Sequence, residues 1–552
     1  MRTRLRTTLV ASVLLTGSLA LGAPSAYAGG TPDPPATART QPTDDGRDGN
    51  AVATPAQRIL PTPSSLKTRR GALTFDAASV IDVGHHPRAS TVTVADGLAT
   101  FLRTPTGYDW TVVRGSKAAH RIVLRVGGPK RLGKEGYSLD VDATTATIEA
   151  RTGTGLFHGV QTLRQLMPSA VEKPGRVSGT TWSVARVRVS DHPRYAVRGA
   201  MLDVARHFMS VADVEKYLDA MVPLKLNTFV LHLSDDQGWR LEIKSWPRLA
   251  TYGGALETGG TPGGSYTQAQ YREIVAYAAA RHITLVPQID LPGHTNAALA
   301  SYAELNCDGT APPRYTGTDV GFSSLCAGKA VTYRFLDDVI TEIAHLTPGH
   351  YISIGGDEAQ STTAADYTKI IDRAQAILKR DGKKMWGWHQ TAGADPAKAS
   401  VAAYWGTAGS GADIALAQEA ARQGERLVMA PADHAYLDMK YAPSTPLGQD
   451  WAGDVSVPAS YDWDPATLVP GVPSKAVAGV LAPVWTETLT NISAVEYMAF
   501  PRLAGIAQLG WSPERTHALE PYLVQIAAQA PRWRAAGTTF YAAPEVAWHR
   551  FA

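Results

Sequence analysis

The chain has 552 residues, and its 53 Lys and Arg against 50 Asp and Glu give a formal net charge of +3 at pH 7. Three of the arginines precede residue 29, where there is no acid, so the remainder is neutral overall and has no dense basic patch, which argues against a nucleic-acid-binding protein. Beyond those residues no stretch of about 18 uninterrupted apolar residues occurs, which argues against a membrane-spanning protein.

The N-terminus has the pattern of an export signal. Three arginines among the first six residues precede an apolar run from Leu9 to Leu21, and Ala26-Tyr27-Ala28 is a small-x-small cleavage sequence. This pattern predicts a secretory signal peptide over residues 1–28. We therefore expect a secreted, extracellular protein with no membrane attachment after cleavage.

Two regions with different compositions follow. Residues 29–55 are rich in Gly, Pro, Thr and Asp, have little to bury, and are expected to form a disordered linker. Residues 56–190 contain short alternating runs, such as Tyr137–Val141 and Ala146–Ala150, and then a helical pattern from Phe157 to Leu166. This combination predicts a small α+β domain.

Residues 191–552 repeat a pattern of strand followed by helix. Helical spacing is clear over Val211–Leu224 and Tyr271–Arg281, and an amphipathic tail covers Leu519–Trp533. Eight strands with helices between several of them predict a (β/α)8 barrel, and the alternative, a doubly wound open sheet, lacks a phosphate-binding loop here. The expected strands are Gly199–Val204, Thr228–Leu233, Thr284–Ile289, Tyr351–Ile354, Lys384–Trp388, Val401–Trp405, Leu427–Ala430 and Val480–Trp485.

The two cysteines, Cys307 and Cys326, lie in a Gly- and Pro-rich segment that reads as a loop. In an exported chain an even pair predicts one disulfide bond. We find no H-E-x-x-H, C-x-x-C or EF-hand spacing, so no metal site and no cofactor are expected.

The most informative stretch runs from His350 to Glu358. Its β-branched and aromatic residues predict a buried strand, and Gly355 and Gly356 let the backbone leave the pleat. Asp357 and Glu358 would point to opposite faces of a strand, so they share a site only where the strand has given way to a loop. Such a loop at the C-terminal end of a parallel strand is where α/β proteins bind ligands.

Polar and aromatic side chains gather at the C-terminal ends of the expected strands. Each has a bland explanation alone, such as a structural ion pair or core packing. Together they describe a mouth that holds a polar ligand with apolar faces, as a sugar is. The set is Arg206, Asp235, His294, Asp357, Glu358, Trp388, Trp405, Tyr436, Asp438, Trp485 and Glu487.

Five motifs in this set resemble, in the same order, those of the β-N-acetylhexosaminidases of glycoside hydrolase family 20. The resemblance covers roughly residues 55–520 and includes the family's small N-terminal domain. A departure is Gln360, where similar bacterial sequences have histidine; it lies outside the motifs. The motifs are Leu202-Asp203-Val204-Ala205-Arg206-His207-Phe208, His232-Leu233-Ser234-Asp235-Asp236-Gln237, Pro292-Gly293-His294-Thr295, Gly355-Gly356-Asp357-Glu358 and Trp485-Thr486-Glu487.

The resemblance implies an exo-acting, retaining enzyme that removes terminal N-acetylhexosamine from β-linked oligosaccharides. Glu358 corresponds to the general acid/base, and Asp357 to the carboxylate that orients the 2-acetamido group of the substrate. The carbonyl oxygen of that group attacks the anomeric carbon to form an oxazolinium ion, and Tyr436 would hydrogen-bond this oxygen. A carboxylate beside the developing cation stabilises charge that exists only near the transition state.

The remaining roles follow from the same resemblance. Asp235 and His294 correspond to the polar pair beside the general acid. Aromatic walls around the sugar ring and the acetamido methyl correspond to Trp388, Trp405 and Trp485, and ligands of the sugar hydroxyls correspond to Arg206, Asp438 and Glu487.

Other functions fit the sequence less well. A chitinase-like endo-acting enzyme would need a D-x-x-D-x-D-x-E run, and a serine hydrolase a G-x-S-x-G motif; both are absent. A secreted sugar-binding barrel without activity would have no need for the Asp357-Glu358 pair. The choice between N-acetylglucosamine and N-acetylgalactosamine, the linkage and the natural polymer stay open, with chitin fragments suggested by secretion.

Overall fold

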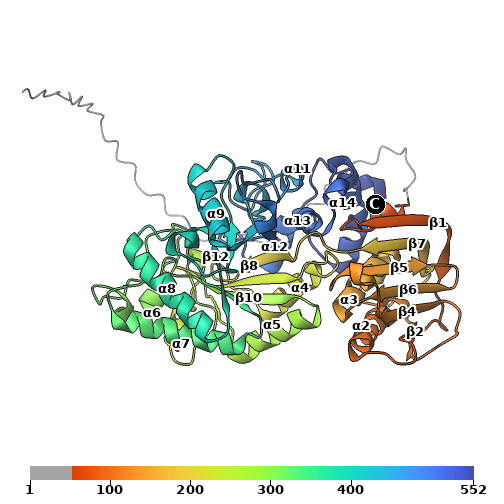
Figure 1. The fold of residues 1–552 in the computed structure, drawn as a ribbon, viewed down its shortest axis with the longest axis horizontal. Helices are drawn as coiled ribbons and strands as arrows, with labels where there is room; N and C mark the ends of the chain where they lie inside the picture. Colours follow the sequence, from red (N-terminus) through yellow and green to blue (C-terminus); the bar gives the residue numbers. More distant parts are fainter. Residues whose placement is uncertain (1–51, 552) are drawn as a thin grey trace, which may run out of the picture. The chain divides into compact units, whose positions relative to one another are not determined.

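The computed structural model describes residues 52–551. The predicted signal peptide and residues 29–51 of the expected linker lie outside the described residues. From Pro55, where the short helix α1 (Pro55–Arg58) begins, the chain forms a seven-stranded sheet and then a closed barrel of eight parallel strands (Figure 1). The predicted fold class, a (β/α)8 barrel preceded by a small α+β domain, is confirmed.

The small domain is a mixed sheet with the strand order β1-β7-β5-β6-β4-β2-β3. Two helices, α2 (Ala89–Thr106) and α3 (Gly153–Leu166), contact each other and the sheet. Helix α3 begins after Thr152, whose Oγ1 accepts a hydrogen bond from Gly155 N at 3.1 Å. The strands are β1 Ser65–Thr74, β2 Ile81–Asp82, β3 Val112–Val113, β4 Arg121–Val126, β5 Tyr137–Val141, β6 Thr145–Ala150 and β7 Ser183–Asp191.

The barrel strands are almost continuously apolar because each is covered on both faces, as parallel strands are. The last strand begins and ends three residues earlier than expected: its pairing with β8 stops at Ala482, and Pro483 has no N–H with which to continue the ladder. The strands are β8 Val197–Asp203, β9 Thr228–Ser234, β10 Thr284–Ile289, β11 Tyr351–Ser353, β12 Lys384–Trp388, β13 Val401–Tyr404, β14 Arg426–Met429 and β15 Val477–Ala482.

Helices connect most of the barrel strands. After β12 the connection is a 3₁₀ turn, His389–Ala394, where a full helix would be usual. The helices are α4 Val211–Met221, α5 Gln268–Ala280, α6 Asn296–Ser301, α7 Ala330–Leu346, α8 Ala364–Arg380, α9 Gly411–Gln423, α10 Ala432–Ala435, α11 Val457–Tyr461, α12 Ile492–Ala499, α13 Arg502–Trp511 and α14 Leu519–Ala536.

The small domain joins the barrel through buried side chains at the N-terminal end of the strands. Trp511, the last residue of α13, lies in the core of the small domain and donates a hydrogen bond to Asp191 Oδ2 at 2.9 Å. Lys225, just before β9, lies 3.2 Å from the same oxygen. These contacts leave the C-terminal ends of the strands for a ligand.

Two further expectations concern the chain as a whole. Cys307 and Cys326 are bonded, with their Cα atoms 4.9 Å apart, which confirms the predicted disulfide. Over residues 52–551, every helix is too short or too polar to cross a bilayer.

Candidate active site

The structure brings all eleven predicted side chains to the C-terminal mouth of the barrel. The pair Asp357 and Glu358 follows β11, where the chain has left the strand, as the sequence requires. Gly355 and Gly356 have φ angles of 63° and 94°, and Glu358 itself has a φ of 44°. A Cβ at residue 355 would lie 1.8 Å from Asp290 Oδ1, so only glycine fits this turn.

Asp357 is a buried carboxylate, 7% exposed, whose Oδ1 has no hydrogen-bond partner among the described residues. Burial and the nearby carboxylate of Asp290 raise its pKa well above the ordinary value. Asp290 is buried too, and burial raises its pKa to about 7. Gly356 N donates to Asp290 Oδ1 at 3.1 Å, so Asp290 holds the turn that carries Asp357 and Glu358.

Glu358 ends a chain of charged groups. Asp235 Oδ1 lies 3.1 Å from His294 Nδ1, and His294 Nε2 lies 3.3 Å from Glu358 Oε2 in an ion-pair contact. Burial alone would lower the pKa of His294, but Asp235 raises it well above the ordinary value. Asp235 therefore favours the charged imidazolium form of His294, and Glu358, whose side chain is 29% exposed, faces both His294 and the solvent-accessible mouth.

Asp235 remains ionised in spite of its burial. Burial opposes ionisation, but the guanidinium of Arg206, 2.9 Å away, and then His294 hold the pKa of Asp235 well below its ordinary value. Arg206 is also 3.4 Å from Asp203. His232 Nε2 lies 2.7 Å from the second oxygen of Asp235. The Asp235 carboxylate is therefore held in place by Arg206, His232 and His294, and its negative charge favours the charged form of His294.

Trp485 is the centre of the aromatic wall. Its ring centroid is 5.9 Å from that of Trp388 and 6.2 Å from that of Tyr436, and the Arg206 guanidinium lies 4.8 Å from it. Trp388 Nε1 has no acceptor within the described chain. Trp405 lies further out and donates to Gln390 Oε1 at 3.2 Å.

Two more carboxylates at the mouth each have one oxygen without a hydrogen-bond donor in the described part of the chain. Asp438 accepts a hydrogen bond from Trp485 N at 3.3 Å through Oδ1, but its Oδ2 and Glu487 Oε2 have no donor among residues 52–551. Burial and the neighbouring Glu487 raise the pKa of Asp438 well above its ordinary value. Buried acceptors without donors are costly, and sugar hydroxyls would satisfy them.

The sequence analysis assigned no role to four further residues of the site. Asp203 and His232 lie within the expected strands and Asp290 one residue beyond one, so each was readable as a strand-end polar residue. Trp451, 52% exposed, lies in the long β14–β15 connection, with ring centroids 6.1 Å from Trp405 and 5.9 Å from Tyr436. No strand or helix pattern marks it.

The acids and His294 come close enough to suggest a metal site, but the charge state opposes one. Ligand atoms of Asp235, Asp236 and His294 lie within 4.8 Å of one another, as do those of His294, Asp357 and Glu358. A metal ion would have to displace the proton that Asp235 favours on His294, because a metal binds the neutral imidazole.

Comparison with known proteins gives a consistent match. Residues 195–514 match the model of the glycosyl hydrolase family 20 catalytic domain, and residues 56–192 match domain 2 of that family. A β-N-acetylhexosaminidase of Cellulomonas fimi is 38% identical over 497 residues, which cover 90% of this chain and 98% of the relative.

Solved structures agree. A mutant Streptomyces plicatus β-hexosaminidase in complex with the product GlcNAc is 54% identical, with a TM-score of 0.87 over 90% of this chain and 98% of that one. The family 20 β-N-acetylhexosaminidase of Streptomyces coelicolor A3(2) is 53% identical, with a TM-score of 0.87 over 90% of this chain and all of that one.

Proposed function

This chain belongs to glycoside hydrolase family 20 and is an exo-acting β-N-acetylhexosaminidase that retains configuration through an oxazolinium intermediate, and from this premise we propose which of its residues perform each step. The observation that carries the assignment is the difference between two adjacent carboxylates. Glu358 is partly exposed beside an imidazolium, whereas Asp357 is buried with one free oxygen.

Glu358 is the general acid and base. It donates its proton to the glycosidic oxygen as the bond to the anomeric carbon breaks, and the His294 imidazolium 3.3 Å away then stabilises the carboxylate. In the second half-reaction Glu358 takes a proton from the attacking water. Asp235 acts as the positioning residue, since it keeps His294 oriented and charged.

Asp357 accepts a hydrogen bond from the N–H of the substrate's acetamido group through its free Oδ1. The acetamido oxygen, held by the Tyr436 hydroxyl, is the nucleophile, an intramolecular arrangement of high effective molarity. In the free enzyme burial raises the pKa of Asp357. The cationic oxazolinium favours the ionised form again, so the interaction strengthens on the way to the transition state.

The sugar ring lies against Trp485, with Trp388 and Trp405 as further walls. The unsatisfied oxygens of Asp438 and Glu487 accept hydrogen bonds from its hydroxyls, and Arg206 donates to them. The exposed ring of Trp451 offers a stacking face to the leaving sugar. The substrates are β-linked N-acetylhexosamine oligosaccharides, and the signal sequence and the disulfide support action outside the cell, on chitin fragments among other glycans.

One experiment tests the role of Asp357. The enzyme is given 4-nitrophenyl β-N-acetylglucosaminide, the matching galactosaminide and the β-glucoside, together with a thiazoline mimic of the oxazoline. We expect turnover of acetamido substrates, almost none of the glucoside, and strong inhibition by the thiazoline. Asp357→Asn should slow the acetamido substrates while the protein stays folded. A covalent sugar ester trapped on Asp357 by a 2-fluoro glycoside would overturn the assignment.

A further inference from the structure

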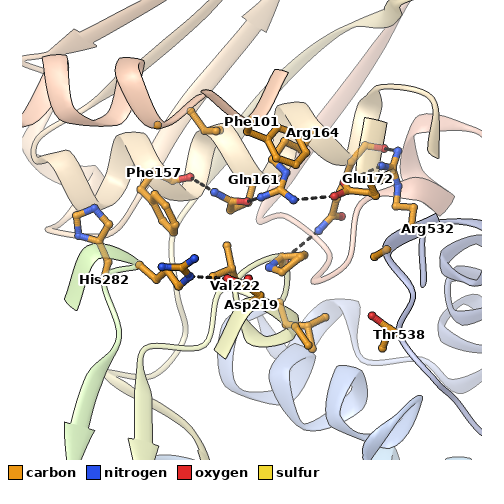
Figure 2. Close-up of a pocket in the computed structure, with 18 of the residues that line it drawn as sticks. Phe101, Phe157, Gln161, Arg164, Glu172, Asp219, Val222, His282, Arg532 and Thr538 are labelled. Carbon is orange, nitrogen blue, oxygen red and sulfur yellow. Dashed lines mark hydrogen bonds and ion pairs between the residues drawn. The ribbon is translucent and has the colours of Figure 1, made fainter. Parts of the chain in front are cut away.

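A cavity lies at the end of the barrel opposite the active site, between α2 and α3 of the small domain, the ends of α4 and α5, and α14 (Figure 2). Its volume is about 510 Å³, within the range of small-molecule sites. The reaction at the mouth of the barrel does not use this cavity.

Much of the cavity wall is apolar. Leu98 and Phe101 come from α2, Val160 from α3, and Val222 and Leu224 from the segment after α4. Trp533 of α14 lies on the same wall. This part of the wall suits the apolar body of a ligand, because burying it there removes apolar surface from water.

One part of the wall has two cations and one anion. Arg164 Nη2 lies 2.7 Å from Glu172 Oε2, and Arg532 Nη1 lies 3.3 Å from Glu172 Oε1. Both arginines are largely buried, and Arg164 Nε has no acceptor in the described part of the chain. Burial lowers the pKa of Arg532 only to about 10, so this guanidinium is charged at neutral pH.

The other charges around the cavity are balanced. Lys216 Nζ lies 2.8 Å from Glu496, and Arg281 Nε lies 2.5 Å from Asp219. One positive charge therefore remains uncompensated, and it is located where Arg164 and Arg532 share Glu172. A buried excess charge is unfavourable unless a counter-ion joins it.

We propose that this cavity binds a small amphiphilic molecule with a single anionic head group, which pairs with Arg164 and Arg532 while its apolar body lies along Leu98 and Val160. The head group is a carboxylate or a phosphate. Such a ligand supplies the missing charge and fills the apolar space at once, which neither an inorganic anion nor a neutral lipid would do.

The test uses octanoate, octyl phosphate and neutral 1-octanol as probes, with binding to the full chain measured by calorimetry. Gly97→Leu is designed to narrow the cavity, since Gly97 lines it. A Cβ at Gly97 meets no atom within 4 Å, and leucine favours the helix more than glycine does, so we expect the fold to be kept. Arg164→Gln removes one cation. Gly411→Leu, at an equally open position outside the cavity, is the matched control.

We expect one of the anionic probes to bind at least about tenfold tighter than 1-octanol, and that difference identifies the head group. Gly97→Leu and Arg164→Gln should each weaken this binding about tenfold or more, while Gly411→Leu leaves it unchanged. Binding of the anions no tighter than that of 1-octanol, or equal binding to the parent and Gly97→Leu, would overturn the proposal.

Discussion

Buried carboxylates at the two ends of the barrel differ in whether the protein supplies their hydrogen-bond donors. At the N-terminal end, Asp191 is fully buried and its carboxylate accepts hydrogen bonds from Tyr137, Trp511 and Lys225. At the mouth, Asp357, Asp438 and Glu487 each keep an oxygen without a donor among the described residues. A buried carboxylate stabilises the fold where the protein supplies its hydrogen-bond donors, and it is free to accept hydrogen bonds from a substrate, as we propose for the mouth, where the protein supplies none.

Removing the proton donor at the mouth should have the largest effect on activity. Glu358→Gln keeps the shape of the side chain but cannot donate a proton, so kcat/KM for oligosaccharides should fall about 10²- to 10⁴-fold. The denaturation midpoint should hardly move, since the side chain is partly exposed and makes one ion-pair contact. An activated aryl leaving group should reduce the loss. Unchanged turnover of oligosaccharides would show that Glu358 is not the acid.

At the opposite end, breaking the buried pair should cost stability and leave catalysis alone. Asp191→Asn leaves Lys225 buried without a counter-charge, which costs about 3–5 kcal/mol of the free energy of unfolding. Urea denaturation measures this. The matched control is Asp140→Asn in the same sheet, whose ion pairs with Arg69 and Arg188 are partly exposed and worth about 0–1 kcal/mol. Equal losses of unfolding free energy from both variants would show that the buried pair of Asp191 and Lys225 stabilises the fold no more than an exposed ion pair does.

Glu425 differs from Asp191, because it is a carboxylate at the N-terminal end of the barrel without hydrogen-bond partners among the described residues. It lies just before β14, at the N-terminal end of the barrel, and both of its buried oxygens lack a partner among the described residues. Burial raises its pKa from 4.5 to about 8. The folded state therefore binds one more proton than the unfolded state between these pH values, and stability falls as pH rises through this window.

Glu425→Gln should remove that loss. We expect the variant to match the parent near pH 4.5 and to exceed it near pH 8.5 by an amount on the order of a few kcal/mol, measured by urea unfolding at both pH values. Activity should stay the same, because the residue is at the end away from the mouth. A parent whose stability does not fall between these pH values would show that Glu425 is ionised and solvated.

The strands and the residues at their ends could be predicted from the sequence, whereas a site residue in a long loop could not. All eight barrel strands, the disulfide and the strand-end residues of the mouth were readable, because burial on both faces gives each strand an apolar run with a polar end. Trp451 was not, since a long loop has no periodicity that shows which side chain returns to the mouth.

The side-chain contacts at the N-terminal end of the barrel could not be predicted from the sequence either. Lys225 and Asp191 are separated by 34 residues, and nothing local relates them. Their contact depends on how the small domain packs against the barrel. The cavity with Arg164 and Arg532 depends on the same packing, since its wall comes from helices of three distant segments.

The smallest predicted effect concerns the outer edge of the mouth. Trp451 is half exposed and contacts Trp405 and Tyr436 edge to face, so its truncation should leave the inner pocket intact. If the contact of the ring with a sugar face is worth as much as an aromatic pair, about 0.5–1.5 kcal/mol, its loss corresponds to a rise in KM of about 2- to 10-fold. Trp451→Ala should show this rise with an N-acetylglucosamine disaccharide and almost none with the methyl glycoside, whose leaving group cannot reach the ring.

Trp485→Ala is the contrasting variant. In the proposed complex its ring faces the sugar that both substrates share, so both KM values should rise. If Trp451→Ala raises both KM values equally, the ring supports the inner pocket and not the leaving sugar, and the mouth would have no separate outer platform.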